Sequence, residues 1–214
     1  MRVSDGRYSR DLKLLGLAWR MVLLGARTPT VADWTHFSVF RIRRLRRTYA
    51  SEALQTTPLK GVTPTQARFF SESTTRRCET AILAGLFRFC DVLPKPGTSI
   101  SLPELRTLSR GEHLCTAYET FRRCCPDSRI SFEHAVLLLD ELVRAVEIRI
   151  DRCHKCFGYV VHDCLSPREP TCGQCSYGTR HARAYFLESG EGASSEDQTS
   201  AMVDTHDDRQ GRLF

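Results

Sequence analysis

The sequence contains no run of 18 or more apolar residues, which excludes a conventional membrane-spanning helix. Near the N-terminus, charged residues interrupt the apolar pattern, and no uninterrupted hydrophobic stretch with a small-residue cleavage site follows. A secretory signal peptide would need both features. We therefore expect a cytoplasmic protein with no membrane partner.

The sequence also lacks the common motifs of enzyme active sites. It has no phosphate-binding loop, no dinucleotide-binding glycine pattern, no G-x-S-x-G motif and no H-E-x-x-H motif. The H-x-E signature of the zinc deaminases is absent as well. The carboxylates Asp140, Glu141 and Glu147 lie along a predicted helix and are expected to be ordinary surface acids. The sequence therefore predicts a protein that is not an enzyme.

The overall composition is that of a globular protein, but the charge is unevenly distributed. The 214 residues are 41% hydrophobic and 26% charged, which allows an ordinary core. Residues 1–50 carry 11 basic and 3 acidic residues, a net charge of +8, whereas residues 187–214 carry a net charge of −5. We expect a basic body that binds polyanions and a disordered acidic tail over residues 187–214.

Hydrophobic periodicity predicts a mainly α-helical domain over residues 1–150. Apolar residues recur at helical spacing over residues 8–26 and again over residues 132–146, where Ser131 is placed to cap the helix. Ser101 and Glu104 have the spacing of a capping box, which predicts another helix start. Gly111 is expected to break the helical region that follows.

Residues 28–49 have the pattern of a helix-turn-helix element. A short helix is expected to end near Thr35, and Ser38 can cap a second helix that carries the apolar residues Phe40, Ile42, Leu45 and Tyr49. Ile42, Leu45 and Tyr49 can anchor one face of this helix. No acidic residue lies between positions 33 and 52 to neutralise the arginines of this helix. Arginine suits both phosphates and guanine edges. The predicted DNA contacts are Arg43, Arg46 and Arg47, on the face opposite the apolar residues, with Arg41 and Arg44 flanking them.

The ten cysteines include one cluster with the spacing of a metal site. Two C-x2-C pairs separated by fifteen residues lie in a polar, turn-rich segment. Two tight turns can place four thiolates around a tetrahedral Zn²⁺ ion, and the valine-rich piece between the pairs can form a small hairpin. We expect a zinc-ribbon domain over residues 151–186 that holds one structural zinc ion per chain through Cys153, Cys156, Cys172 and Cys175.

The order of these features resembles the FlhC family, the zinc-binding subunits of the bacterial flagellar master transcriptional regulator. The resemblance covers residues 8–185. It is carried by Leu23-Leu-Gly-Ala-Arg27, the R-x-x-R-L-x-R-x-Y pattern of residues 41–49, a proline/glycine loop at 58–64, Ala117-Tyr118 with Cys125-Pro126, and the four-cysteine segment.

The resemblance implies a mainly helical protein with a helix-turn-helix-like region at residues 28–49 and zinc ligands at the four cysteines named above. It also implies a heterohexamer of four FlhD and two FlhC chains that binds promoter DNA and recruits RNA polymerase. The sequence differs from the better-known members of the family in its acidic tail and over residues 66–115. The prediction is thus a DNA-binding activator subunit that acts with an FlhD-like partner on flagellar operons.

Two other classes of protein remain as alternatives. A zinc-ribbon adaptor would bind another protein without contacting DNA, and a thiol–disulfide oxidoreductase would use a single C-x2-C pair. The arginine run without neighbouring acids favours DNA binding over the adaptor. The doubled cysteine pair disfavours the oxidoreductase, because redox chemistry needs only one pair.

Overall fold

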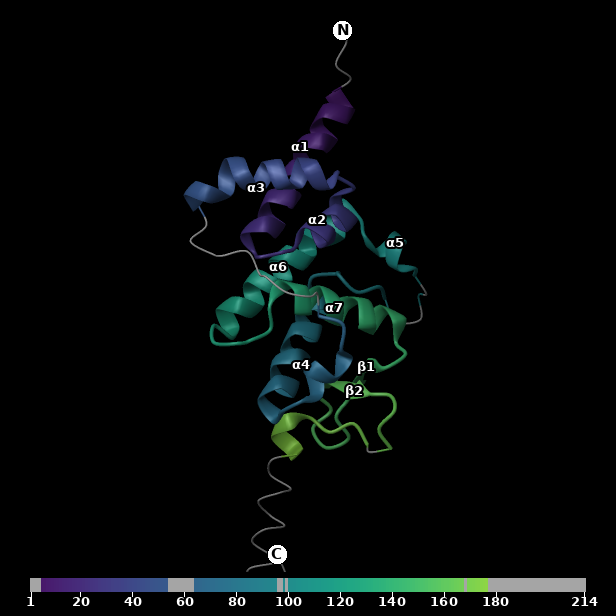
Figure 1. Cartoon of the computed structure of the whole chain (residues 1–214). Coiled ribbons are helices and arrows are strands. Elements are labelled where there is room, and N and C mark those ends of the chain that lie inside the picture. The colour runs from purple at the N-terminus through teal and green to yellow at the C-terminus, as the bar shows by residue number, and fades with distance from the viewer. Residues whose placement is uncertain (1–4, 54–63, 96–97, 99, 168, 177–214) are drawn as a thin grey trace, which may run out of the picture. The chain divides into compact units, whose positions relative to one another are not determined.

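Helices form most of the computed structural model, which describes residues 5–53, 64–95, 98, 100–167 and 169–176 (Figure 1). The predicted mainly helical fold, with a four-cysteine cluster near the C-terminus, is confirmed. The predicted acidic tail lies outside the described residues. The elements are α1 (Asp5–Leu23), α2 (Thr28–Thr35), α3 (Val39–Ala53), the 3-10 helix η1 (Ala67–Ser71), α4 (Thr74–Phe89), α5 (Leu102–Leu105), α6 (Leu108–Cys124), α7 (Phe132–Arg144), β1 (Ile148–Arg152) and β2 (Tyr159–Asp163).

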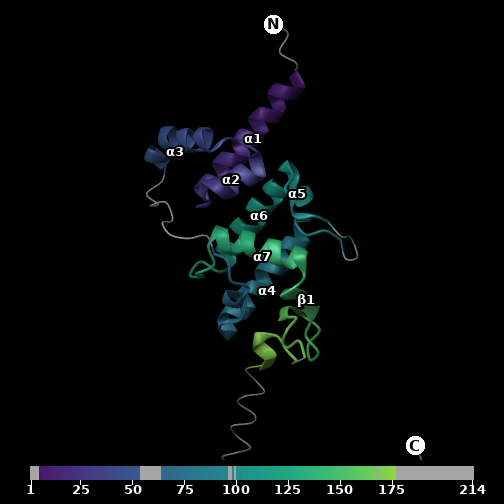
Figure 2. The ribbon, with the colours of Figure 1, turned by 45° about the vertical axis from the view of Figure 1, so that its right-hand side comes forward.

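The first three helices pack against one another (Figures 1 and 2). Leu17 of α1, Trp34 of α2 and Ile42 of α3 are buried in the same hydrophobic core. His36 adopts a left-handed conformation (φ 57°) that ends α2. The hydroxyl of Ser38 then accepts a hydrogen bond from the backbone N–H of Arg41, as the predicted cap requires. Only residues 36–38 therefore separate α2 from α3.

The helix α6 contacts α1, α2 and α4, and Gly111 lies within it. The predicted helix break at this glycine is wrong, because α6 runs without interruption from Leu108 to Cys124. Gly111 is buried, and a Cβ atom there would lie 2.7 Å from Leu17 Cδ2 and 3.3 Å from Trp34 Cε3. The absence of a side chain thus allows α6 to approach α1 and α2 closely.

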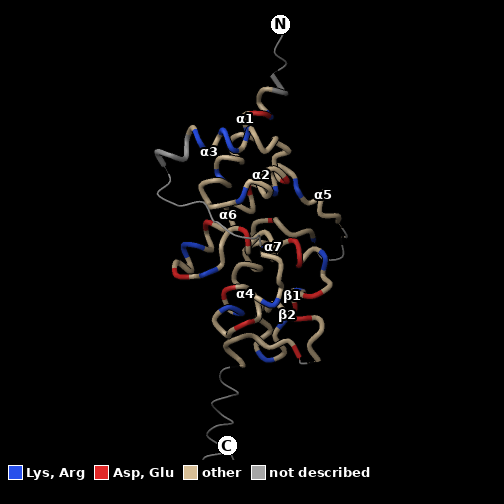
Figure 3. The backbone as a smooth tube through the Cα atoms, in the orientation of Figure 1, with Lys and Arg blue, Asp and Glu red and all other residues tan. Residues whose placement is uncertain are grey.

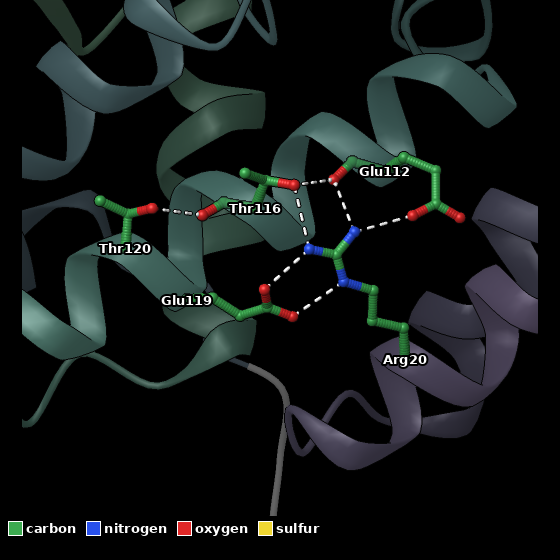
Figure 4. A network of polar contacts seen from close by, with 5 residues as sticks. All are labelled: Arg20, Glu112, Thr116, Glu119 and Thr120. Atoms are coloured by element: carbon green, nitrogen blue, oxygen red, sulfur yellow. Dashed lines mark hydrogen bonds and ion pairs between the residues drawn. The ribbon is translucent and has the colours of Figure 1, made fainter.

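Beside this close approach, Arg20 of α1 binds two glutamates of α6 (Figure 4). Its Nε and Nη2 donate to the two carboxylate oxygens of Glu119 at 2.8 and 2.7 Å, and its Nη1 donates to Glu112 at 2.8 Å. The hydroxyl of Thr116 accepts a further hydrogen bond from Nη2 at 3.0 Å. The hydrogen bond to Glu119 raises the pKa of Arg20 and lowers the pKa of Glu119. Because the guanidinium group is planar, these contacts fix both the position and the rotation of α1 on α6.

The C-terminal part of the fold joins helices to a small antiparallel hairpin. The strand β1 pairs with β2 so that Ile148 lies opposite Asp163 and Arg152 lies opposite Tyr159. The strand β2 contacts α4, and β1 contacts α7. The domain boundary expected after residue 150 falls inside β1. No helix in the part of the chain described here combines the length and apolar character that a membrane span needs.

The helix α7 begins with a capping box that contains a histidine. The hydroxyl of Ser131 accepts a hydrogen bond from the N–H of His134, while the backbone N–H of Ser131 donates to His134 Nδ1 at 3.3 Å. The imidazole is half-buried and stacks on Phe69, with a ring-centroid distance of 4.0 Å. Burial, together with the charges of Arg76 and Arg27, lowers the pKa of His134. The neutral form, which can accept a hydrogen bond at Nδ1, is therefore the one that the fold favours.

Substitution of Gly111 by alanine tests whether close packing explains the glycine inside α6. We expect Gly111→Ala to lower the free energy of unfolding by about 1–2 kcal/mol, because the buried side chains of Leu17 and Trp34 would have to shift to make room for the methyl group. Gly85 in α4 is the matched control, since a Cβ atom there meets nothing within 4 Å. Gly85→Ala should raise the free energy of unfolding by about 0.5–1 kcal/mol through helix propensity. Urea unfolding of both variants measures this, and equal stabilisation by the two would contradict the packing explanation.

The capping histidine also predicts a pH dependence. A histidine whose pKa is lowered on folding contributes stability that is present above its ordinary pKa of 6.5 and is lost as the pH falls through the folded-state value. His134→Gln keeps a hydrogen-bond acceptor at the capping position but cannot titrate. We therefore expect the stability of the wild type to fall more steeply than that of His134→Gln between pH 7 and pH 5. Thermal unfolding at several pH values measures the difference, and parallel curves would show that His134 does not titrate with folding.

Candidate metal centre and arginine face

The first pair of predicted metal ligands lies in the loop of the β-hairpin. Cys153 directly follows β1, and a turn at residues 154–156 brings Cys156 back towards it. The N–H of Cys153 donates to the carbonyl of Gly158, and the N–H of Phe157 donates to the carbonyl of Cys153, both at 2.9 Å. The sequence predicted a hairpin between the two cysteine pairs. In the structure β1 precedes the first pair, so the hairpin loop itself carries Cys153 and Cys156.

The second pair lies at the start of a helical turn formed by residues 173–176. The N–H of Ser176 donates to the carbonyl of Cys172 at 2.9 Å, and the N–H of Cys175 donates to Cys172 Sγ at 3.4 Å. The N–H of Cys172 in turn donates to Cys153 Sγ at 3.4 Å. Backbone donors thus hold two of the four sulfur atoms in place.

The four cysteines come together as the sequence predicted. Their Sγ atoms all lie within 4.8 Å of one another, and those of Cys156 and Cys172 are 3.7 Å apart. Four sulfur atoms arranged tetrahedrally around a metal ion at about 2.3 Å would be about 3.8 Å apart. Cys153 is buried, whereas Cys156 is exposed. The cluster could therefore hold one metal ion close to the surface of the protein.

The environment of the sulfur atoms makes a cation necessary if all four are to ionise. Burial alone would raise the pKa of Cys153, but the backbone N–H groups of Cys172, Cys156 and Lys155 lower it to about 6. The pKa of Cys175 is raised to about 12 by hydrogen bonds with the thiols of Cys172 and Cys156. Four thiolates at this distance repel one another unless a metal ion compensates their charge. Metal binding should accordingly release protons.

Gly173 positions the cluster against the first turns of α4. A Cβ atom on Gly173 would lie 2.5 Å from Cys78 Sγ and 3.1 Å from the carbonyl oxygen of Thr74. A glycine between two cysteines of one turn is also favoured locally, because it relieves crowding in that turn. The structure adds a contact with α4, which no local pattern could reveal because Cys78 lies far away in the chain.

His154 connects the two halves of the cysteine segment without belonging to the cluster. Its backbone N–H donates to the carbonyl of Pro170 at 3.0 Å, and its Nδ1 lies 3.1 Å from the hydroxyl of Thr171. These contacts hold the segment before Cys172 beside the loop that carries Cys153. Among the described residues the cluster consists of the four cysteines that the sequence predicted as ligands.

Basic residues recur along α3 (Figure 3). Arg41, Arg43, Arg44 and Arg47 are exposed, and none of them forms an ion pair within the described part of the chain. The guanidinium of Arg41 lies 3.8 Å from the centre of the Phe37 ring, which fixes the direction of this side chain. Positive charge is thus concentrated on the face of α3 that points away from the core.

Arg46 does not lie on that face. Its guanidinium is half-buried and donates a hydrogen bond to the carbonyl of Ala26, at the end of the turn that precedes α2. Burial lowers the pKa of Arg46. The predicted exposure of Arg46 beside Arg43 and Arg47 is therefore wrong, because position 46 follows Leu45 on the side of α3 that packs against its neighbours.

Phe40 was expected among the apolar residues of this helix and was not identified as a candidate contact residue, but the structure places it on the exposed side beside Arg44 and Arg47. The side chain of Phe40 is 75% exposed. With Arg44, Arg47 and Thr48 it lines a shallow hollow on α3. These four residues have the spacing i, i+4, i+7 and i+8, so they form one stripe on the side of the helix opposite Ile42. This spacing is the signal in the sequence that would have identified the stripe.

No protein-family model and no curated protein matches the sequence. The resemblance to the FlhC family therefore stays a prediction.

The two glycines of the cysteine segment provide a matched test of how the cluster is positioned. Gly173→Ala forces Cys78 and Thr74 apart from the second pair, so we expect the metal to be released about tenfold faster to a chelator. Gly158→Ala places a Cβ atom at an ordinary 3.5 Å from Cys156 Sγ and should change the release rate little. A colorimetric chelator assay on the full-length chain measures both rates. Similar rates for the two variants would show that the contact with α4 does not support the cluster.

Proposed function

We propose that the protein is a DNA-binding transcriptional activator subunit that acts with an FlhD-like partner at flagellar promoters. The observation that carries the proposal is the exposed face of α3, where Arg43, Arg44 and Arg47 form no ion pair within the described residues. A folded protein gains nothing in stability from gathering like charges. A polyanionic partner explains why they are gathered.

The arrangement of α2 and α3 supports a helix-turn-helix mode of binding. Two helices joined by three residues and packed against α1 have the connection of a helix-turn-helix, whose second helix enters the major groove. The groove is about 12 Å wide and admits one α-helix. In this proposal α3 lies in the groove, Arg44 and Arg47 contact phosphates or guanine edges, and Arg41 and Arg43 contact the flanking backbone. Arg46 holds the turn before α2 and does not reach DNA.

We further propose that the metal is zinc, with one ion per chain. Soft thiolate ligands in a tetrahedral set favour Zn²⁺ among the common cellular metals. Four protein ligands leave no open position for water or substrate, which supports a structural role and a protein that is not an enzyme. The two-stranded hairpin has little core of its own, so zinc would supply part of its folding free energy.

The proposed partner is an FlhD-like subunit, in a heterohexamer of four FlhD-like and two FlhC-like chains that recruits RNA polymerase in the cytoplasm. This part of the proposal comes from the resemblance. One feature of α1 supports a helical partner: Tyr8 and Leu12, one turn apart, are 64% and 58% exposed.

Replacing two arginines of α3 tests the proposal directly. We expect Arg44→Ala/Arg47→Ala to weaken binding to a fluorescein-labelled flagellar promoter duplex at least tenfold at low salt. The slope of log K against log salt should fall by about 2, because each lost phosphate contact removes about 0.9 from it. Fluorescence anisotropy with the zinc-loaded chain, alone and with an FlhD-like subunit, measures both quantities. Metal analysis of the same samples should give one zinc per chain.

The double variant Arg123→Ala/Arg129→Ala is the control, since it removes the same charge from exposed positions outside α3. It should bind DNA as the wild type does. Equal weakening by the two double variants would mean that α3 is not the DNA-binding element. A stable complex with the FlhD-like subunit and no salt-dependent DNA binding would instead favour the adaptor alternative.

A further inference from the structure

An exposed aromatic ring lies among the arginines at the start of α3. Phe40 is the second residue of the helix, and its side chain is 75% exposed and outside the hydrophobic core. It shares one stripe of the helix with Arg44 and Arg47, and the three line the same hollow. This exposed ring adds little to the hydrophobic core, and its position among the arginines of α3 leaves it open to contact with the same partner as the arginines.

The backbone around Phe40 is held firmly on both sides. The hydroxyl of Ser38 accepts a hydrogen bond from the N–H of Arg41, and the carbonyl of Ser38 accepts another from the N–H of Ile42 at 3.1 Å. Arg41 is stacked on Phe37, and the side chain of Ile42 is fully buried. The first turn of α3 is thus anchored, and Phe40 extends from an anchored turn into solvent.

A phenyl ring cannot read the donors and acceptors of a base pair. The apolar group that a base presents in the major groove is the 5-methyl group of thymine. Residues in the first turns of the second helix of a helix-turn-helix reach the base edges, whereas residues further along the helix contact the backbone more often. Both the position of Phe40 in the first turn of α3 and its apolar ring therefore suit contact with a thymine methyl group.

We propose that Phe40 packs against a thymine methyl group and makes the protein prefer thymine at one position of its binding site. This inference rests on the proposed function, because it requires α3 to lie in the major groove. Arg44 and Arg47 would supply most of the affinity, and Phe40 would supply the preference for thymine at one base pair. Burial of one methyl group corresponds to about a fourfold difference in affinity.

The test removes the methyl group from the DNA and the ring from the protein. Preferred sites are first selected from a random duplex library with the zinc-loaded full-length chain, together with the FlhD-like subunit. Each conserved thymine is then replaced by deoxyuridine, which lacks only the methyl group, and affinities are measured by anisotropy. We expect one replacement to weaken wild-type binding about fourfold and to have no effect on Phe40→Ala.

Two further variants complete the test. Phe40→Leu retains an apolar side chain and should keep part of the preference for thymine. Phe89→Ala removes a phenyl ring that is 86% exposed on α4 and should keep all of it. Circular dichroism establishes that the variants are folded, as expected for substitutions at exposed positions.

The possible failures are distinguishable. If wild type and Phe40→Ala bind DNA but respond equally to every deoxyuridine, the role of Phe40 is rejected and the proposed function stands. If no variant binds DNA, both proposals are rejected together. If Phe40→Ala loses the FlhD-like subunit in size-exclusion chromatography and Phe89→Ala does not, Phe40 contacts protein and the inference is overturned.

Discussion

The contact between α1 and α6 determines how the arginine face is presented. At this contact Gly111 removes a side chain so that Leu17 and Trp34 can pack closely, and Arg20 binds Glu112 and Glu119 beside it. Apolar packing sets the distance between the helices, and the planar guanidinium sets their rotation. Since α2 and α3 pack on α1, the direction of the exposed arginines depends on a contact that α3 does not itself make.

A buried carboxylate of α7 provides a second connection, which joins α7 to the start of α2. Glu133 of α7 is 2% exposed and accepts hydrogen bonds from the backbone N–H of Arg27 at 2.7 Å and from the hydroxyl of Thr30 at 2.8 Å. Arg27, at the N-cap of α2, makes no capping hydrogen bond with its side chain, so a carboxylate from another helix caps α2 instead. Arg46 holds the carbonyl of Ala26 in the same turn. One arginine of the α3 run thus serves the fold, whereas Arg41, Arg43, Arg44 and Arg47 remain exposed.

In the cysteine segment, local turns form the pairs of cysteines and a long-range contact positions them. The hairpin loop and the helical turn each bring two sulfur atoms together locally, and the contact of Gly173 with Cys78 decides where the cluster lies on α4. A metal ion would stabilise the local turns and the contact with α4 at once, since both pairs must be in place to bind it. In the proposed function this links the fold of the C-terminal segment to the helices before it.

The sequence by itself determined the features that depend on neighbours in the chain. Ser38 and Ser131 cap helices because a cap is a local hydrogen bond, and the four cysteines meet as predicted because each pair lies within one turn. Only the tertiary structure decided the role of Gly111, which is a packing position instead of a break, and of Arg46, which is turned inward. It likewise left Phe40 exposed on the outward stripe. These outcomes depend on which surfaces meet across long separations in the chain, and hydrophobic periodicity carries no information about the partner that each helix face will contact.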